Sequence, residues 1–480
     1  MLIHQDEVDG VPLFWAEAPG PFVAGLLFRV GRVDERLYTS GITHLVEHLA
    51  IPAWAPKPGL EWNGWVSLTS TCFWASGEPA DVAAFLSEVT RQLHDLPLGR
   101  LETEKGILRA EEASVGRGMA AAIAGIRFGA VGIALIDFRE LGLRTLDAET
   151  VARWAQERFT TGNAALCMSG PPPPELELHL PPGPRHPPPR YEPPPDNLPA
   201  YSHWGSGGVA LSLFAPRSYA LGLAWQAAEQ RAIRRLRYER GLIYSLSATN
   251  TPPNREDANI VFIAECVDAN VDAVCAGLLE VLEEIATDGP SDEEHDQWLG
   301  AMERAARDPN EAVSVVATFA EDLLLDDFRT NEQALAGARA VTARDAATAI
   351  RTALLSAILL IPEEGAAAPP PPFNLFESAE PAVRINGRRF PPKGLKGRLG
   401  RQGYAIVGDD GAAWQSPDGT RVDIAFHDCE ALMTWADGTM SLINAHGGWF
   451  SLETGLIRNG DEASEAILRA IPSERVVPMD

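Results

Sequence analysis

The pattern of apolar and polar positions indicates alternating strands and helices near the N-terminus. The apolar runs 11–18 and 22–30 are typical of strands. A helix is expected at 41–50, a strand-like run at 65–76, then several helices and a short apolar strand at 164–170. We therefore predict an α+β arrangement, with a mixed, mostly antiparallel sheet covered by helices.

The same order of elements recurs in the middle of the chain. A strand pattern at 209–216 precedes a helical pattern at 221–239, and strand-like runs follow at 242–249 and 259–266. Helices come next, and the apolar segment 356–362 closes the series as 164–170 closes the first. This repetition predicts a tandem duplication of one α/β-layered domain.

Two proline-rich stretches mark the boundaries between domains. Residues 171–199 hold 14 of the 38 prolines, and a second run covers 363–372. Proline is excluded from helix interiors and central strands, so both stretches are expected to be extended linkers. They leave three predicted domains, at 1–170, 200–362 and 373–480.

The last piece has a different pattern from the first two. Asp-Gly pairs at 410–411, 418–419 and 437–438, and an Asn-Gly pair at 459–460, separate short strand-like runs. Such pairs between apolar runs are typical of β-hairpins. With a final helix expected at 461–471, residues 373–480 are predicted to form a small β-rich accessory domain.

Composition and charge exclude several classes of protein. The 480 residues carry a net charge of −26, which opposes binding to nucleic acid. Five scattered cysteines argue against a disulfide framework. The apolar stretch 120–136 is short and contains Arg127, so it predicts a buried helix and no membrane association. The N-terminus shows no secretory pattern, and we expect a cytoplasmic protein.

The candidate chemistry begins in the segment SGITHLVEHL, at 40–49. His44 and His48 are four residues apart and share one face of a helix, with Ser40 as its expected N-cap. Two imidazoles one turn apart suit zinc, and Glu47 between them can activate water as a general base. A histidine pair arising by chance is the alternative. The H-x-x-E-H order is the inverzincin motif.

A third ligand must come from another part of the chain. Glu104 and Glu111 are seven residues apart, close to two helical turns, so they point the same way. One of them can reach a metal while the other supports the site. Taken alone, the pair would be read as solvent-facing glutamates of a charged helix.

These motifs together resemble those of the pitrilysin family, which includes insulin-degrading enzyme and mitochondrial processing peptidase. The resemblance covers about residues 1–362, and it implies that Glu111 is the third zinc ligand and that Glu104 supports the site. It also implies that the strand beginning at Asn63 forms the substrate edge. The separation of His48 and Glu111 is shorter than is usual in the family, which affects the expected shape of the cleft.

A second motif of the family lies in the segment LRYERGLIY, at 236–244. The resemblance implies that Arg237 and Tyr244 bind substrate or stabilise the transition state. Both side chains are suited to stabilising a developing oxyanion. A helix that ends at Gly241, with a solvated arginine, explains the same residues without a function.

The resemblance implies a zinc-dependent endopeptidase with one zinc per chain. It further implies that peptides bind in an extended form at a sheet edge, inside a chamber completed by a second chain in a homodimer or heterodimer. The net charge suggests a preference for basic peptides. The basic run 383–402 is expected to be solvated or to contact an acidic surface. The rival hypothesis is a non-catalytic family member that acts as a binding or regulatory partner.

Overall fold

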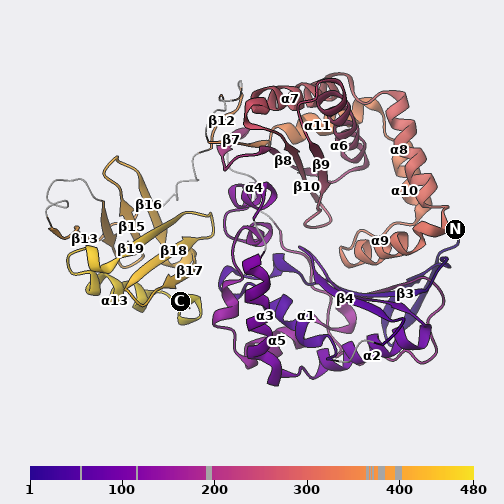
Figure 1. Cartoon of the computed structure of the whole chain (residues 1–480), viewed down its shortest axis with the longest axis horizontal. Helices are drawn as coiled ribbons and strands as arrows, with labels where there is room; N and C mark the ends of the chain where they lie inside the picture. Colours follow the sequence, from indigo (N-terminus) through magenta and orange to yellow (C-terminus); the bar gives the residue numbers. More distant parts are fainter. Residues whose placement is uncertain are drawn as a thin grey trace.

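The computed structural model describes residues 1–53, 57–114, 117–190, 197–363, 367, 369, 372–376, 384–394 and 403–479. Figure 1 shows three units. Each of them has its own buried core. The first unit (residues 1–190) and the second unit (197–376) each contain one six-stranded sheet, and the third unit (384–479) contains two four-stranded sheets. None of the described helices is long and apolar enough to cross a membrane.

The first sheet has the strand order β1-β2-β6-β3-β5-β4. Its strands are β1 (His4–Val8), β2 (Val11–Trp15), β3 (Phe22–Phe28), β4 (Glu61–Val66), β5 (Thr71–Gly77) and β6 (Ala164–Met168). The run 65–76, predicted as one strand-like segment, is instead divided by a turn. The Ser70 amide donates to the Ser67 hydroxyl at 3.0 Å, which gives the backbone a local partner and reverses the chain.

The helices of the first unit begin with α1, which carries the candidate metal ligands. They are α1 (Ile42–Ala50), α2 (Pro79–His94), α3 (Leu101–Ser114), α4 (Met119–Phe128) and α5 (Ala148–Arg158). The helix expected over 120–136 ends earlier, at Phe128. Gly129 follows with a φ of 73°, and a 3-10 segment (Gly132–Asp137) comes after it. Glycine reaches this conformation without a side-chain clash and so ends the helix.

The second sheet has the order β12-β7-β11-β8-β10-β9, and its last five strands repeat the topology of the last five strands of the first sheet. The first strand of each order differs, because β1 pairs antiparallel with β2 whereas β12 pairs parallel with β7. In both sheets the second and third strands of this order are parallel, and the following pairs are antiparallel. The strands are β7 (Ala200–His203), β8 (Gly208–Pro216), β9 (Ser245–Asn250), β10 (Asp257–Glu265), β11 (Ile358–Ile361) and β12 (Asn374–Leu375). This common strand order in the two sheets agrees with the predicted duplication.

The helices of the second unit pack mainly beside one face of its sheet. They are α6 (Tyr219–Ala232), α7 (Val271–Asp288), α8 (Asp292–Ala305), α9 (Ala312–Leu324), α10 (Asn331–Arg339) and α11 (Ala343–Leu354). A π-helical segment (Ile233–Glu239) extends α6. The helical pattern predicted at 221–239 thus corresponds to α6 and this extension.

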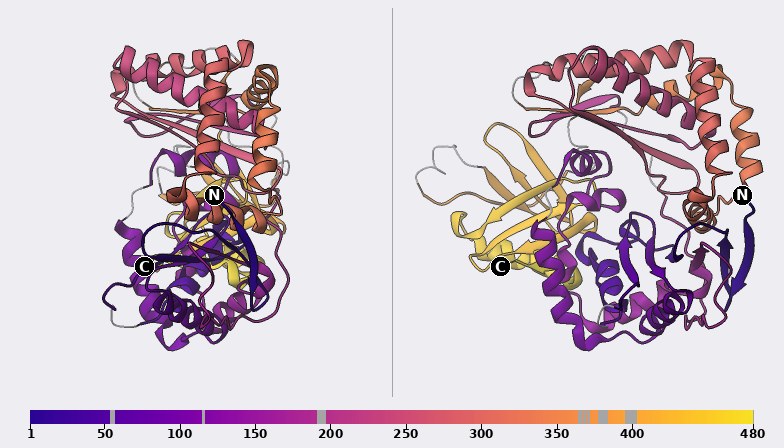
Figure 2. Two further views of the ribbon diagram at one scale, coloured as in Figure 1. Left: turned by 90° about the vertical axis from the view of Figure 1, so that its right-hand side faces the viewer. Right: turned by 45° about the vertical axis from the view of Figure 1, so that its right-hand side comes forward.

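Each of the first two units packs one of its helices, α4 or α9, on the sheet of the other unit. Leu26 faces the first unit's own core, whereas its neighbour Leu27 contacts the cluster formed by α9 of the second unit. In return, α4 packs on the second sheet, where the buried Arg127 guanidinium donates to the Ser212 and Ser356 carbonyls. Figure 2 shows both crossing helices between the two sheets. This exchange fixes the relative position of the units, because each sheet depends on the other unit for burial of its second face.

The proline-rich segment 171–190 is extended and contains no described helix or strand. It is not detached from the fold, because Leu176, Leu178 and Leu180 are buried in the core of the first unit. The predicted linker therefore also serves as part of that core.

The third unit is β-rich, as its Asp-Gly pairs predict. Its strands are β13 (Arg388–Phe390), β14 (Tyr404–Val407), β15 (Gly411–Gln415), β16 (Arg421–Ala425), β17 (Cys429–Thr434), β18 (Thr439–Asn444), β19 (Trp449–Glu453) and β20 (Val476–Pro478). The Asn-Gly prediction is wrong: Asn459, in the left-handed region with φ 56°, is the N-cap of α13 (Gly460–Ala470). Within the basic run, Arg388 pairs with Glu462 of the same unit, and residues 395–402 lie outside the described ranges.

The third unit contacts the first close to the candidate site. Leu37 and Leu141 are buried together with Ala431, Ile443 and Val477. The Ala130 amide also donates to the Ala445 carbonyl at 3.0 Å. The contact therefore supports the two short segments that flank α1 in space, Leu37–Thr39 and Leu141–Arg144.

Candidate metal centre

The start of α1 is capped by a glutamate and not by the predicted serine. Glu35 accepts hydrogen bonds from the Gly41 and Thr43 amides, both at 2.9 Å. Ser40 instead donates to the Leu37 carbonyl and accepts from the Leu141 amide. The prediction of Ser40 as N-cap is wrong because Gly41, with φ 90°, is the residue at the N-cap, and the capping carboxylate comes from a more distant position.

His44 and His48 lie on one face of α1, and each ring is held by a carboxylate. Their ring centroids are 5.0 Å apart. The Nδ1 of His44 is 3.1 Å from Glu140, and the Nδ1 of His48 is 3.2 Å from Glu104. With Nδ1–H donating to a carboxylate, the Nε2 of each ring is left as the metal-binding atom.

Each of these two carboxylates is in turn held by an arginine. Arg32 lies 3.3 Å from Glu140, and Arg100 lies 2.6 Å from Glu104. Each imidazole is therefore oriented by a glutamate that is itself held by an arginine. The supporting role predicted for Glu104 fits this geometry. Sequence reasoning missed Glu140, which is 96 residues from His44 and belongs to no local motif.

The contact between His44 and Glu140 changes the pKa of both residues. Burial lowers the pKa of His44, but the hydrogen bond to Glu140 and the Glu140 charge outweigh it and raise the pKa above its ordinary value. Burial raises the pKa of Glu140, yet its bond to His44 and the charges of His44 and Arg32 bring the pKa below the usual range. Metal binding must therefore compete with a proton that His44 holds more firmly than an ordinary histidine does.

Glu47 is almost fully buried beside the two histidines, with 2% of its surface exposed. Its carboxylate packs on the backbone of Gly64 in β4, where any side chain would overlap it. Burial raises the pKa of Glu47 to about 7, with Glu111 and Glu104 adding to the rise and His44 opposing it. Glu47 is thus fixed in place and titrates close to neutral pH, as suits a general base.

The donor set fits a divalent metal. Within the described residues, ligand atoms of His44, Glu47 and His48 all lie within 4.8 Å of one another. Glu111, two helical turns after Glu104 on α3, places Oε2 3.8 Å from the Nε2 of His48. Two imidazoles and a carboxylate are a common zinc donor set. The choice of Glu111 as ligand and Glu47 as base stays a prediction, since a carboxylate oxygen of Glu47 lies at the same 3.8 Å from His48.

Comparison with known proteins bears on the family and the fold of this chain. Residues 145–299 match the sequence profile described as Peptidase M16 inactive domain. A crystal structure of a peptidase M16 inactive domain from Pseudomonas fluorescens has the same fold, at 14% identity and a TM-score of 0.62, over 75% of this chain and 98% of that one. The relation to the pitrilysin family is therefore confirmed.

Other solved structures share the fold. A protease from Helicobacter pylori superposes with a TM-score of 0.61 at 15% identity, covering 75% of this chain and 99% of that one. Pitrilysin superposes with a TM-score of 0.56 at 13% identity, over 75% of this chain and 44% of its own. No curated protein matches this chain in sequence. The profile match begins after α1 and α3, so it carries no information on the residues that form the metal centre.

Arg237 and Tyr244, of the segment 236–244, lie in the second unit, whereas the two histidines lie in the first. Both side chains are exposed, and Arg237 lies over the ring of Tyr238. No contact within the described ranges joins either residue to the two histidines. Gly241 between them has a φ of 63°, which agrees with its predicted role as a helix stop.

β4 forms one edge of the first sheet and lies directly against the metal centre through Gly64. Asn63 and Trp65 flank this glycine, and both side chains are exposed. An edge strand has unpaired backbone groups that an extended peptide can pair with. The edge predicted for substrate binding is therefore next to Glu47.

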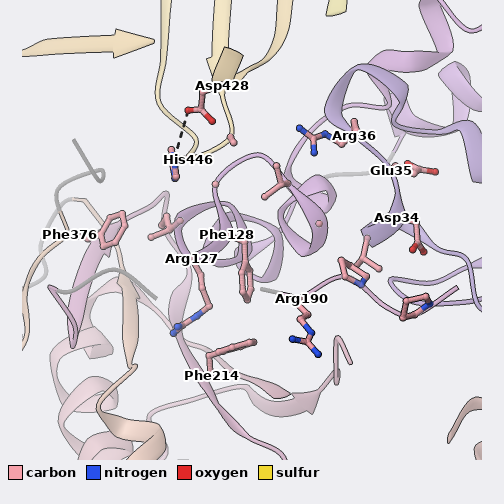
Figure 3. Close-up of a pocket in the computed structure, with 18 of the residues that line it drawn as sticks. Asp34, Glu35, Arg36, Arg127, Phe128, Arg190, Phe214, Phe376, Asp428 and His446 are labelled. Atoms are coloured by element: carbon pink, nitrogen blue, oxygen red, sulfur yellow. Dashed lines mark ion pairs between the residues drawn. The ribbon is translucent and has the colours of Figure 1, made fainter. Parts of the chain in front are cut away.

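Two cavities lie in this part of the molecule. The larger, about 880 Å³, is at the junction of the three units and is drawn in Figure 3. Asp34 and Glu35 border it, but they are engaged by Arg29 and by the start of α1, respectively. The smaller, about 520 Å³, is bordered by His44, Glu111 and Glu140. Of these two cavities, the smaller is beside the metal ligands, and it belongs to the candidate site.

Proposed function

We propose that this chain is a zinc-dependent endopeptidase that hydrolyses peptides or unfolded polypeptides. The observation that carries the proposal is the pair of imidazoles on α1, each oriented by a buried carboxylate, with Glu47 between them. In the proposal, His44, His48 and Glu111 hold one zinc per chain. Each of the two rings is oriented by its own carboxylate–arginine pair. Such support is typical of histidines that bind a metal and is not expected for a chance histidine pair.

Zinc, when bound, polarises a carbonyl group and makes water more acidic. The protein's own part in hydrolysis is carried by Glu47, which takes the proton from the attacking water. The same carboxylate then gives the proton to the leaving amine. Its contact with Gly64 places this base beside the edge of β4, where an extended substrate would pair. Arg237 and Tyr244 are proposed, from the family resemblance, to assist from the second unit.

A second candidate function is a non-catalytic binding or regulatory partner of an active peptidase. The match to a profile described as an inactive domain favours it, and so does the likeness to a solved inactive domain. Metal binding and turnover separate the two candidates, because a non-catalytic partner has no need of Glu47 as a base.

The test combines zinc content with peptide hydrolysis. Protein dialysed against metal-free buffer is expected to retain about one zinc per chain, and His44→Ala should lose it. Glu47→Gln should keep the zinc and lose at least about a hundredfold in turnover of a mixed peptide library. Glu149→Gln, an exposed change on α5, is the matched control and should behave as the wild type.

Failure of the wild type to take up added zinc would favour the non-catalytic partner. Equal peptide turnover by the wild type and Glu47→Gln would refute the role of the base. Zinc binding without turnover of any peptide would also favour the non-catalytic function.

The proposal includes an assembly and a location. A homodimer or a heterodimer with a related chain would complete the chamber, and the cytoplasm is the proposed compartment. Light scattering coupled to gel filtration would test the first point, since a monomeric mass at working concentration contradicts a homodimer.

A further inference from the structure

The cavity of about 520 Å³ beside His44 has no part in the hydrolysis described above. Its apolar lining residues are Leu108, Ala120, Ala121, Ile136 and Phe138. Three arginines border it, namely Arg32, Arg117 and Arg139. A lining that combines apolar and charged residues is suited to a side chain that has a carbon stem and a charged end.

The three glutamates that also border the cavity already have partners. Glu140 is bonded to His44 and paired with Arg32. Glu112 accepts a hydrogen bond from the Glu140 amide at 2.6 Å. Glu111 is assigned to the metal by the proposed function. These carboxylates therefore hold the site together and are not open to a basic substrate group.

Two of the arginines are open to a substrate. The side chains of Arg117 and Arg139 are exposed, and within the described ranges neither forms an ion pair or a hydrogen bond. Asp137 is close enough for Arg117 to lower its pKa, although burial raises that pKa overall, so it offsets part of the Arg117 charge. Arg139 has no such acidic neighbour among the described contacts.

The balance of charge in the cavity is positive once a metal is present. The three glutamates match the three arginines in number, and Asp137 beside Arg117 adds one carboxylate, so a divalent cation beside His44 would leave an excess of one positive charge. This local excess contrasts with the net charge of −26. Distant surface charges are screened over about 8 Å at physiological ionic strength, so the charges that border the cavity decide what it accepts.

We propose that this cavity is a specificity pocket for an acidic side chain of the substrate, recognised by Arg117 and Arg139. The inference rests on the proposed peptidase function. It places an aspartate or glutamate beside the cleaved bond, on the His44 side of the metal. It also replaces the expectation, drawn from net charge, that basic peptides are preferred.

The test uses the zinc-loaded full-length protein and peptides that differ at one position. Glu, Gln or Lys is placed in turn at each of three positions on either side of the cleaved bond. At one position we expect kcat/KM for Glu to exceed that for Gln by about tenfold, the effect of one charge-assisted hydrogen bond, with Lys the poorest. In Arg117→Gln/Arg139→Gln this ratio should fall to about one, whereas Arg153→Gln, an exposed change outside the cavity, should keep it.

A binding measurement separates this inference from the proposed function. Fluorescence anisotropy with labelled peptides and the Glu47→Gln variant should show the same Glu-over-Gln preference without hydrolysis, and the double variant on that background should lose it. If no peptide is cleaved, the peptidase proposal fails, while selective binding of the Glu peptide still supports the pocket. Equal binding of Glu and Gln peptides, a preference for Lys, or a Glu preference that survives the double substitution would overturn it.

Discussion

Replacing Glu47 by glutamine should abolish activity and at the same time stabilise the metal-free protein at alkaline pH. Burial raises the pKa of Glu47 from 4.5 to about 7. A group with a raised pKa in the folded state contributes stability below its unfolded pKa and loses it as the pH rises through the folded pKa. The wild type should therefore lose stability between about pH 4.5 and pH 7, and glutamine, which carries no charge, should not.

The magnitude follows from the size of the shift. A difference of about 2.5 pKa units corresponds to roughly 3 kcal/mol at full ionisation, and relaxation around the buried carboxylate reduces it, so we expect about 1–3 kcal/mol at pH 8. For a unit of this size, that gain raises the thermal midpoint of the first unit by roughly 2–10 °C. Near pH 5 the two proteins should unfold at almost the same temperature.

The assay is thermal unfolding in the presence of a chelator, at half-unit steps from pH 5 to pH 8. Glu61→Gln serves as the control, because its side chain is exposed and its curve should follow the wild type. With zinc added, the advantage of Glu47→Gln should shrink, since a nearby cation stabilises the carboxylate. A constant difference between Glu47→Gln and the wild type at every pH, or a less stable variant at pH 8, would refute the reasoning.

Three further predictions concern the surroundings of the metal and the contact between the first two units. Gly64→Ala should displace Glu47 and reduce peptide turnover by about a hundredfold while zinc content is kept, and turnover like that of the wild type would contradict the contact. Glu140→Gln should weaken zinc binding by about 10–100-fold at pH 8. It should also move to lower pH the point below which zinc affinity starts to fall, because the carboxylate that raises the pKa of His44 is gone; competition titrations across pH measure both effects. Arg127→Ala should destabilise the contact of α4 with the second sheet by about 2–4 kcal/mol, as read from chemical unfolding, because two buried carbonyls lose their donor.

Local patterns in the sequence determined much of the fold. The α/β-layered class, the repeated order of strands and helices, and the β-rich third unit were predicted from periodicity and Asp-Gly pairs alone. These features depend on neighbours within a few residues, so the chain shows them directly. The prediction at Asn459 was wrong for the same local reason, because a left-handed asparagine can start a helix as readily as it forms a hairpin.

The candidate metal ligands and the candidate base were predicted from the sequence because they belong to local motifs. The spacing of His44 and His48 and of Glu104 and Glu111 is helical, and α1 and α3 present these pairs as the spacing requires. The pairing of Glu104 with Arg100 is local as well, at one helical turn. The assignment of zinc and of catalytic roles stays a prediction, since it depends on the bound metal.

Only the tertiary structure decided what surrounds these residues. Glu140 reaches His44 from 96 positions away, Gly64 of a neighbouring strand fixes Glu47, and the cap of α1 comes from Glu35 and not from Ser40. The exchange of α4 and α9 between the two sheets likewise has no local pattern. Each of these contacts joins segments that are distant in sequence. The segments come together because the folded chain buries their apolar faces against one another, and a short stretch of sequence cannot predict that packing.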